Sequence, residues 1–317
     1  MIEISRILCP VDFSEPSTVA LRAAFMLARW YDADVVVPYI AQLSLPPAPF
    51  APVPPITLTN EERERTRVQL QRFVEDAGPG DVRVDTEVRE GSVVDDILRL
   101  ADEQPADLIV MGTHGRTGFD HLLVGSVTER VLRKSDRPVL TVRGGDAVVP
   151  ESPPAPFRSI LCPIDFSPAS LAALQYALNL AQESGGRLTV LHVPDWPAEV
   201  SGVEVLGPRA AEYQRRLVDA SRLRLQSAVP DSARSWCEIE ERVAFGRPWE
   251  AILDETTRCA ADLIAIGAHG REGLLRHVLG STTDHVVRAA ACPVLTVRDL
   301  PARAASGEAR REAASAR

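Results

Sequence analysis

Two glycine-rich segments have the residue types and spacing of a phosphate-binding loop. Each reads Gly-x-x-Gly, then nine residues, then Gly-Ser, and they run over 112–126 and 267–281. Glycine lets backbone amides approach an anion closely, and a helix that begins at the serine directs the positive end of its dipole to the same place. Hydroxyls of the serine and the threonines that follow would add donors. We therefore expect a phosphate at each segment; the alternative is that the glycines serve only turn geometry and close helix packing.

The chain offers almost no lysine side chains that could bind such a phosphate. Of the 35 basic residues only Lys134 is lysine, which excludes a Walker A loop. Amides, helix ends, hydroxyls, arginine and Mg2+ are then expected to balance a triphosphate. No repeated carboxylate stands near the loops to orient water, because Asp120 of the first has Leu275 as its counterpart. We predict no catalytic residues, no protein metal site and hydrolysis that is slow at most.

Three sequence blocks occur twice in the same order, which indicates a duplicated domain. The pairs are 7–14 (ILCPVDFS) with 160–167 (ILCPIDFS), 107–118 with 262–273, and 138–143 with 293–298, the last pair being PVLTVR in both copies. We place the domains at 1–145 and 158–300. A proline-rich linker joins them at 146–157, and a tail at 301–317 is expected to be disordered.

Hydrophobic patterning predicts the order βαβαβαβαβ in each copy. In the first copy we expect strands at 6–11, 35–40, 82–88, 108–111 and 139–142, and helices at 14–31, 61–76, 93–103 and 126–133. The strands of the second copy are expected near Ile160 and at 188–193, 237–243, 263–266 and 294–297. The fold class is α/β, with two tandem open parallel five-stranded sheets and helices on both faces.

The first copy departs from the second around its second strand. Pro38 stands where the second copy has Leu191, and a proline in an inner strand loses a ladder hydrogen bond. The segment 42–56 that follows holds six prolines. It is either a solvated insertion or a lid over the first site. Both features distinguish the surroundings of the first site from those of the second.

These motifs resemble those of the universal stress protein family, in particular its ATP-binding branch, whose signature is G-x-x-G, nine residues, then G-[ST]. The resemblance covers nearly the whole chain apart from linker and tail. It includes P-[VI]-D-F-S after the opening strand, the loop H-G-R-x-G and the terminal P-V-L-T-V. It implies a Rossmann-like domain, similar to the adenine nucleotide alpha hydrolases, that binds ATP. Family domains often dimerise through their last strands, and tandem members carry two domains in one chain.

The resemblance also implies which residues meet the nucleotide. Asp12 and Asp165 match the aspartate at the adenosine end, and such a carboxylate can accept hydrogen bonds from sugar hydroxyls or base amines. The alternative is that each serves only the turn into the following helix. The other implied contacts are Pro10, Val11, Ile40, Met111, Gly112, His114, Gly115, Gly125, Ser126, Val127 and Thr128 in the first copy, and Pro163, Ile164, Val193, Ile266, Gly267, His269, Gly270, Gly280, Ser281, Thr282 and Thr283 in the second.

Two kinds of loop residue remain open between a binding and a structural role. His114 and His269 could each donate to a phosphate, or each could be a structural loop histidine. Arg116 and Arg271 could add charge, or they could be ordinary exposed arginines.

Composition narrows the function classes. The 317 residues are 45% apolar and 25% charged with a net charge of -9, typical of a soluble globular protein and not of a nucleic-acid binder. No apolar run approaches the roughly 18 residues of a membrane helix, so we expect a cytoplasmic protein. None of the five cysteines stands in a C-x-x-C spacing, and we expect reduced, mostly buried thiols.

We therefore predict a stress-response regulator that binds ATP or another adenine nucleotide. The alternative is a partner-binding or chaperone-like stress module with one or both sites vestigial. A nucleotidyl-transfer enzyme is disfavoured because the S-G-G-x-D-S and H-I-G-H motifs are missing. The PVLTVR strands would be a liability as open sheet edges. We therefore expect them to lie adjacent in an internal pseudo-dimer, with a homodimer of the whole chain left open.

Overall fold

The computed structural model describes residues 3–42, 57–113, 124–144, 157–195, 208–270 and 278–299, without the side chains of 208–211. The proline-rich segment at 43–56, the linker at 146–156 and the tail at 301–317 lie outside these residues, so the expectations for them stay predictions.

The described residues form the predicted alternation of strands and helices in both copies. The first copy contains β1 (Arg6–Leu8), α1 (Glu15–Tyr31), β2 (Asp34–Gln42), α2 (Asn60–Asp76), β3 (Val84–Gly91), α3 (Val93–Glu103), β4 (Leu108–Gly112), α4 (Ser126–Lys134) and β5 (Val139–Val142). The second contains β6 (Ser159–Pro163), α5 (Pro168–Ser184), β7 (Arg187–His192), α6 (Pro208–Ala228), the 3-10 helix η3 (Asp231–Ser235), β8 (Glu238–Val243), α7 (Pro248–Arg258), β9 (Leu263–Gly267), α8 (Ser281–Ala289) and β10 (Val294–Val297). The α/β class is confirmed.

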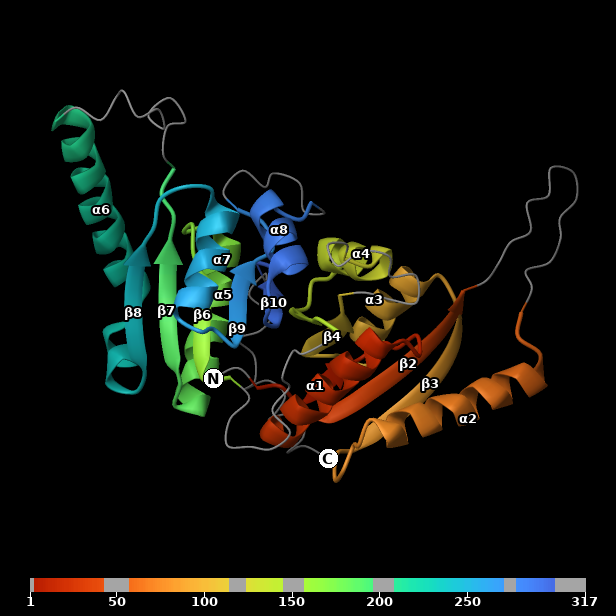
Figure 1. Cartoon of the computed structure of the whole chain (residues 1–317). Helices are drawn as coiled ribbons and strands as arrows, with labels where there is room; N and C mark the ends of the chain where they lie inside the picture. The colour runs from red at the N-terminus through yellow and green to blue at the C-terminus, as the bar shows by residue number, and fades with distance from the viewer. Residues whose placement is uncertain are drawn as a thin grey trace, which may run out of the picture.

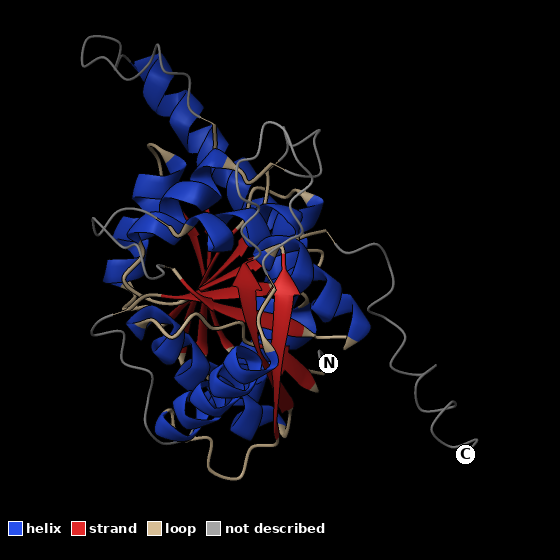
Figure 2. Cartoon of the chain, turned by 90° about the vertical axis from the view of Figure 1, so that its right-hand side faces the viewer, coloured by secondary structure: helices blue, strands red, loops and turns tan. Residues whose placement is uncertain are grey.

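The two five-stranded sheets join into one sheet of ten strands. The strand order is β3-β2-β1-β4-β5-β10-β9-β6-β7-β8, parallel within each copy and antiparallel only between β5 and β10. Figure 2 shows the strands as a twisted central layer between helices. Helices α1, α2, α5 and α6 bury residues in the core on one face, and α3, α4, α7 and α8 in the core on the other. Figure 1 shows α2 and α6 at the two ends of this sheet.

The seam between the copies has an internal two-fold axis. Leu140 of β5 lies opposite Leu295 of β10, and these two leucines hold the same place in the two PVLTVR blocks. A residue that faces its own counterpart marks an isologous contact, as at the centre of a symmetric dimer. The PVLTVR strands are thus adjacent, in agreement with the expected internal pseudo-dimer.

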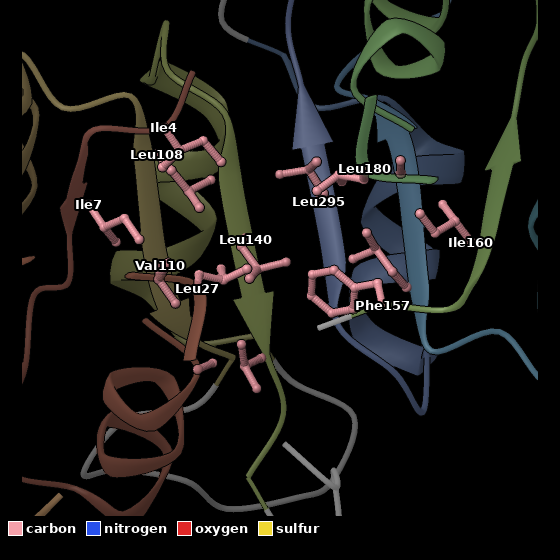
Figure 3. Close-up of a cluster of buried hydrophobic side chains, with 14 of the residues drawn as sticks. Ile4, Ile7, Leu27, Leu108, Val110, Leu140, Phe157, Ile160, Leu180 and Leu295 are labelled. Carbon is pink, nitrogen blue, oxygen red and sulfur yellow. The ribbon is translucent and has the colours of Figure 1, made fainter. Parts of the chain in front are cut away.

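Apolar side chains on one face of the seam continue the core from one copy into the other. Figure 3 shows Leu140 and Leu27 of the first copy facing Leu295, Leu180 and Phe157 of the second. Leu140 is 2% exposed and Leu295 is 5% exposed. The copies therefore share apolar surface as well as a strand ladder, which makes the chain one continuous structure.

The strand expected at 6–11 is shorter in the structure, because β1 ends at Leu8. The carbonyl of Pro38 accepts the Val11 N–H at 3.0 Å, so Pro38 faces β1, but it has no N–H to return. In the second copy Leu191 replaces this proline, pairs with Pro163, and β6 continues to Pro163. The proline that we noted in the sequence thus shortens the first strand rather than removing the second.

Candidate functional site

The predicted contacts of the second copy gather at the carboxyl ends of β6 and β9, which are neighbours in the sheet. Asp165 follows β6, and Gly270 follows β9. A β-carbon built on Gly270 would stand 2.6 Å from Asp165 Oδ2, so the glycine loop lies directly against this carboxylate. Open α/β sheets bind their ligands at this edge. The structure therefore brings together the two motifs that the sequence separates by about a hundred residues.

One oxygen of each aspartate is used at the start of a helix. Asp165 Oδ1 accepts the N–H of Ser167 at 2.9 Å, and Asp12 Oδ1 accepts the N–H of Ser14 at 3.0 Å. Ser167 and Ser14 in turn cap α5 and α1. The helix-start role that we considered as an alternative is thus present in both copies. It accounts for Oδ1, whereas Oδ2 of Asp165 faces the glycine loop.

The phenylalanine after each aspartate has a left-handed backbone, with φ of 63° at Phe13 and 66° at Phe166. This conformation is costly for a residue with a large side chain and persists only where the surroundings impose it. Here neighbouring side chains hold each phenylalanine ring in place, an arrangement that we call a clamp. Phe13 stacks on Tyr39 with centroids 4.6 Å apart, and Phe166 lies 4.7 Å from the ring of His192.

The helices at the two ends of the sheet, α2 and α6, also contact these phenylalanine rings. Phe73 of α2 meets Phe13 edge-on at 5.4 Å, and the guanidinium of Arg224 of α6 lies 3.8 Å from the centre of the Phe166 ring. The clamp fixes the backbone that carries the aspartate, and sequence analysis did not detect it. The signal was the phenylalanine itself, which both copies of the P-[VI]-D-F-S motif contain.

The first glycine of each loop packs against a helix. A β-carbon on Gly112 would stand 2.7 Å from the carbonyl oxygen of Pro16, and one on Gly267 would stand 2.7 Å from the backbone nitrogen of Ser170. Real side chains never approach backbone atoms so closely, so only glycine lets α1 and α5 lie against the ends of β4 and β9. For these two glycines the structure shows the close packing that we stated as the alternative to phosphate binding.

The last glycine of each loop is held to the end of the same strand. The N–H of Gly125 donates to Thr113 O at 2.6 Å, and the N–H of Gly280 donates to Ala268 O at 2.8 Å. These bonds place the first turns of α4 and α8 beside β4 and β9. Neither helix has a side-chain hydrogen bond at its N-cap, which is Gly125 or Gly280. The amides of the first turn are thus not capped by a side chain, as an anion site at this place requires.

Thr128 and Thr283 use their hydroxyl hydrogens inside the fold. Thr128 donates to Gly112 O at 2.8 Å and Thr283 to Gly267 O at 2.7 Å, and both threonines are buried. They tie the helix to the strand, so they position the loop rather than offer donors to a ligand. Ser126 and Ser281 are exposed at the helix starts.

His269 lies in the second glycine loop with one ring nitrogen buried. Its Nδ1 is buried and has no hydrogen-bond partner among the described residues. Burial lowers the pKa of this histidine, and the nearby Arg298 lowers it further. His114 and Gly115, with Arg116 and Arg271, lie outside the described residues, so their roles stay predictions.

The remaining predicted contacts are strand ends and helix starts at the same edge. Those that are buried are Val11, Ile40, Met111, Pro163, Ile164 and Ile266. Those that are partly exposed are Pro10, Val127, Val193 and Thr282. Val11 and Ile164 pack into the core on one face of the sheet, whereas Ile40, Met111 and Ile266 pack into the core on the other.

Three further observations on the described parts of the chain concern metal ligands, membrane-spanning helices and thiols. They contain no group of three or more histidine, cysteine, aspartate or glutamate side chains arranged to hold a metal ion. No helix there has the length and apolar character needed to cross a membrane. Cys9, Cys162 and Cys237 are buried free thiols, and burial raises the pKa of each.

Each copy is thus an open Rossmann-like α/β domain with a glycine loop at the ligand-binding edge, in the fold of the adenine nucleotide alpha hydrolases. Comparison with known proteins defines the class further. A sequence model of the universal stress protein family matches residues 3–143 and again 156–298. The chain belongs to the universal stress protein family and contains its domain twice.

Relatives of similar length support this assignment. A universal stress protein of Mycolicibacterium smegmatis is 30% identical over 301 residues, covering 92% of this chain and 96% of the relative. One of Mycobacterium tuberculosis is 31% identical over 218 residues, covering 68% of this chain and 69% of the relative. The crystal structure of a universal stress protein from Archaeoglobus fulgidus has the same fold, with a TM-score of 0.63 at 22% identity over 93% of this chain and 98% of that one.

Proposed function

We propose that this tandem universal stress protein binds ATP or another adenine nucleotide at the carboxyl edge of each half of the sheet, and regulates a stress response through that binding. The observation that carries the proposal is the contact of Asp165 Oδ2 with Gly270, beside the uncapped start of α8. A carboxylate for hydroxyls or amines and a set of amides for a phosphate then face one space.

In this proposal each group of residues meets one part of the nucleotide. The first-turn amides of α8 and the hydroxyl of Ser281 bind phosphate, together with the loop amides at Gly270. Asp165 accepts hydrogen bonds from the ribose or base, and Ile164 and Val193 contact the base. Mg2+ would balance the phosphates and arrive with the nucleotide. The corresponding residues of the first copy form a second site.

We propose regulation rather than catalysis, with hydrolysis that is slow at most. Water activation needs a base close to the terminal phosphate. The repeated loop motif contains no carboxylate at a shared position, and Asp165 is assigned to the ribose or base rather than to the terminal phosphate.

Isothermal titration of the full chain with Mg-ATP tests this function, together with mass spectrometry of any nucleotide that co-purifies and its stoichiometry. We expect the paired change Asp12→Ala and Asp165→Ala to weaken binding by at least about tenfold, since each removes a hydrogen-bonded carboxylate. The matched control is Asp254→Ala, which changes an exposed aspartate on α7. Protein that carries no nucleotide and shows no heat of binding would instead support the partner-binding or chaperone-like alternative.

A single methyl group provides a finer test of the second site. In Gly270→Ala the new β-carbon would stand 2.6 Å from Asp165 Oδ2, so the carboxylate must turn away. The end of a side chain can move at little cost, and we expect thermal stability to change by less than about 1 kcal/mol. Nucleotide affinity of the second site should nevertheless fall severalfold, measured by titration in an Asp12→Ala background. Unchanged affinity would show that Asp165 does not contact the nucleotide.

A further inference from the structure

The arginine that ends the last strand of the second copy reaches into the first copy. Arg298 is 6% exposed, and its Nη2 donates to Leu132 O at 3.2 Å and to Arg133 O. Both carbonyls belong to the last turn of α4, where a helix has no backbone donors of its own to satisfy them. A buried guanidinium from one copy therefore completes the C-terminal end of a helix in the other.

The arginine at the same place in the first copy makes the reciprocal contact. Arg143 Nη1 donates at 3.4 Å to the carbonyl of Ala290, the C-cap residue of α8. A positive charge at this end also interacts favourably with the helix dipole. The two arginines close the two PVLTVR blocks, so the duplicated motif supplies a strand for the seam and a cap for the opposite helix.

An ion pair fixes the two helices to each other. Arg288 of α8 contacts Glu129 of α4 across the seam, with Nη2 and Oε2 3.2 Å apart. Arg288 is held in turn by Asp284 of its own helix at 2.9 Å. Figure 1 shows α4 and α8 on the same side of the sheet, on either side of the seam. The position of each helix thus depends on residues of the opposite copy.

We propose that Arg298 and Arg143 are positioning residues, each of which holds the phosphate-binding helix of the opposite copy from its far end. This inference rests on the proposed function, in which the first turns of α4 and α8 bind phosphate. The arginine holds the last turn of a nine-residue helix, and the nucleotide occupies the first. Each nucleotide site is then completed across the seam.

Arg298 also lies close to the site of its own copy. Arg298 follows Val297, whose carbonyl accepts the N–H of Ala268, the residue before His269 in the second glycine loop, at 2.7 Å. One side chain therefore belongs to a residue beside the loop of the second site while it holds the helix of the first. The two sites are expected to be linked, and the link should run through this residue.

Amide hydrogen exchange in the full chain without added nucleotide tests the positioning role directly. We expect Arg298→Ala to speed exchange in α4, and Arg143→Ala to speed exchange in α8, so each variant affects the opposite copy. The control Arg187→Ala removes an exposed ion pair with Glu238 at the other edge of the sheet and should change neither helix. Exchange that rises only around the mutated arginine, or in neither helix, would overturn the proposal whether or not nucleotide binds.

Nucleotide affinity provides the second readout. In an Asp165→Ala background, where only the first site remains, we expect Arg298→Ala to raise the Kd for Mg-ATP by about threefold to tenfold. Arg298→Lys keeps the charge at the helix end and should recover part of this loss. An unchanged Kd with ATP still bound would overturn the positioning role alone. Absence of ATP binding in the parent background and in the wild-type chain would overturn the proposed function, and the link between sites with it.

Discussion

Replacing Leu140 with aspartate is expected to lower the free energy of unfolding by more than about 3 kcal/mol, because a core side chain is lost and an unpaired charge is buried. Leu140 lies on the internal two-fold axis, 2% exposed, against Leu295. A carboxylate there finds apolar neighbours on both sides of the seam. Urea unfolding followed by circular dichroism measures the loss.

Two further variants make this result specific to the seam. Leu295→Asp places the charge at the symmetric position and should cost a similar amount. Leu223→Asp introduces the same charge on α6, where the leucine is 65% exposed, and should change stability by less than about 0.5 kcal/mol. If Leu140→Asp were as mild as Leu223→Asp, β5 and β10 would not be paired in solution.

The second large effect is expected at the first glycine of each loop. In Gly267→Ala the new β-carbon would stand 2.7 Å from Ser170 N and 2.9 Å from the carbonyl carbon of Ala169. Both are backbone atoms of α5, so the whole helix must shift rather than one side chain. We expect a loss of about 3 kcal/mol, at the upper end of overpacking costs. Gly112→Ala should behave alike, since its β-carbon would meet the backbone of Pro16.

Gly185→Ala is the matched control for this steric effect, and thermal unfolding compares the variants. Gly185 ends α5 with a φ of 59°, and a β-carbon there meets nothing within 4 Å. Its replacement should cost only the left-handed backbone strain, about 1 kcal/mol. Equal losses at Gly185 and Gly267 would mean that α5 does not pack closely on β9.

Much of the architecture could be predicted from local pattern. Helix α3 and the strands β5 and β10 begin and end where the periodicity placed them. The seam was predictable as well, because two identical apolar strands that would otherwise be open sheet edges can cover each other by pairing. The duplication strengthened the predictions of the elements and of the seam, since a pattern seen in one copy could be compared with the same pattern in the other.

The features that escaped prediction depend on contacts between distant segments. The left-handed backbone of Phe13 and Phe166 is not a property that phenylalanine favours, and the clamping side chains come from β2, β7, α2 and α6. The partners of Arg143 and Arg298 lie in the opposite copy, so no local pattern reveals them. Their identical place in the two PVLTVR blocks was the only signal, and we attributed that block to the strand alone.

The glycines illustrate the same limit. The glycine spacing predicted a phosphate-binding loop, but it could not show which residues of the loop have a structural role and which face the site. In the structure the first glycine makes room for α1 or α5, and a buried threonine ties a different helix, α4 or α8, to the strand. Gly270, by contrast, lies against the carboxylate of Asp165.

The internal two-fold axis has a consequence for how this chain can evolve. In a symmetric dimer of identical chains every substitution at the interface appears twice, so a change must suit both sides at once. Here each seam position is encoded separately, and the halves are free to drift apart. Some divergence is visible already: Arg298 reaches carbonyls of the last turn of α4, whereas Arg143 reaches the cap residue beyond α8. Because the two copies stand in one chain, the two halves of the seam can diverge, and the two proposed nucleotide sites can acquire different affinities.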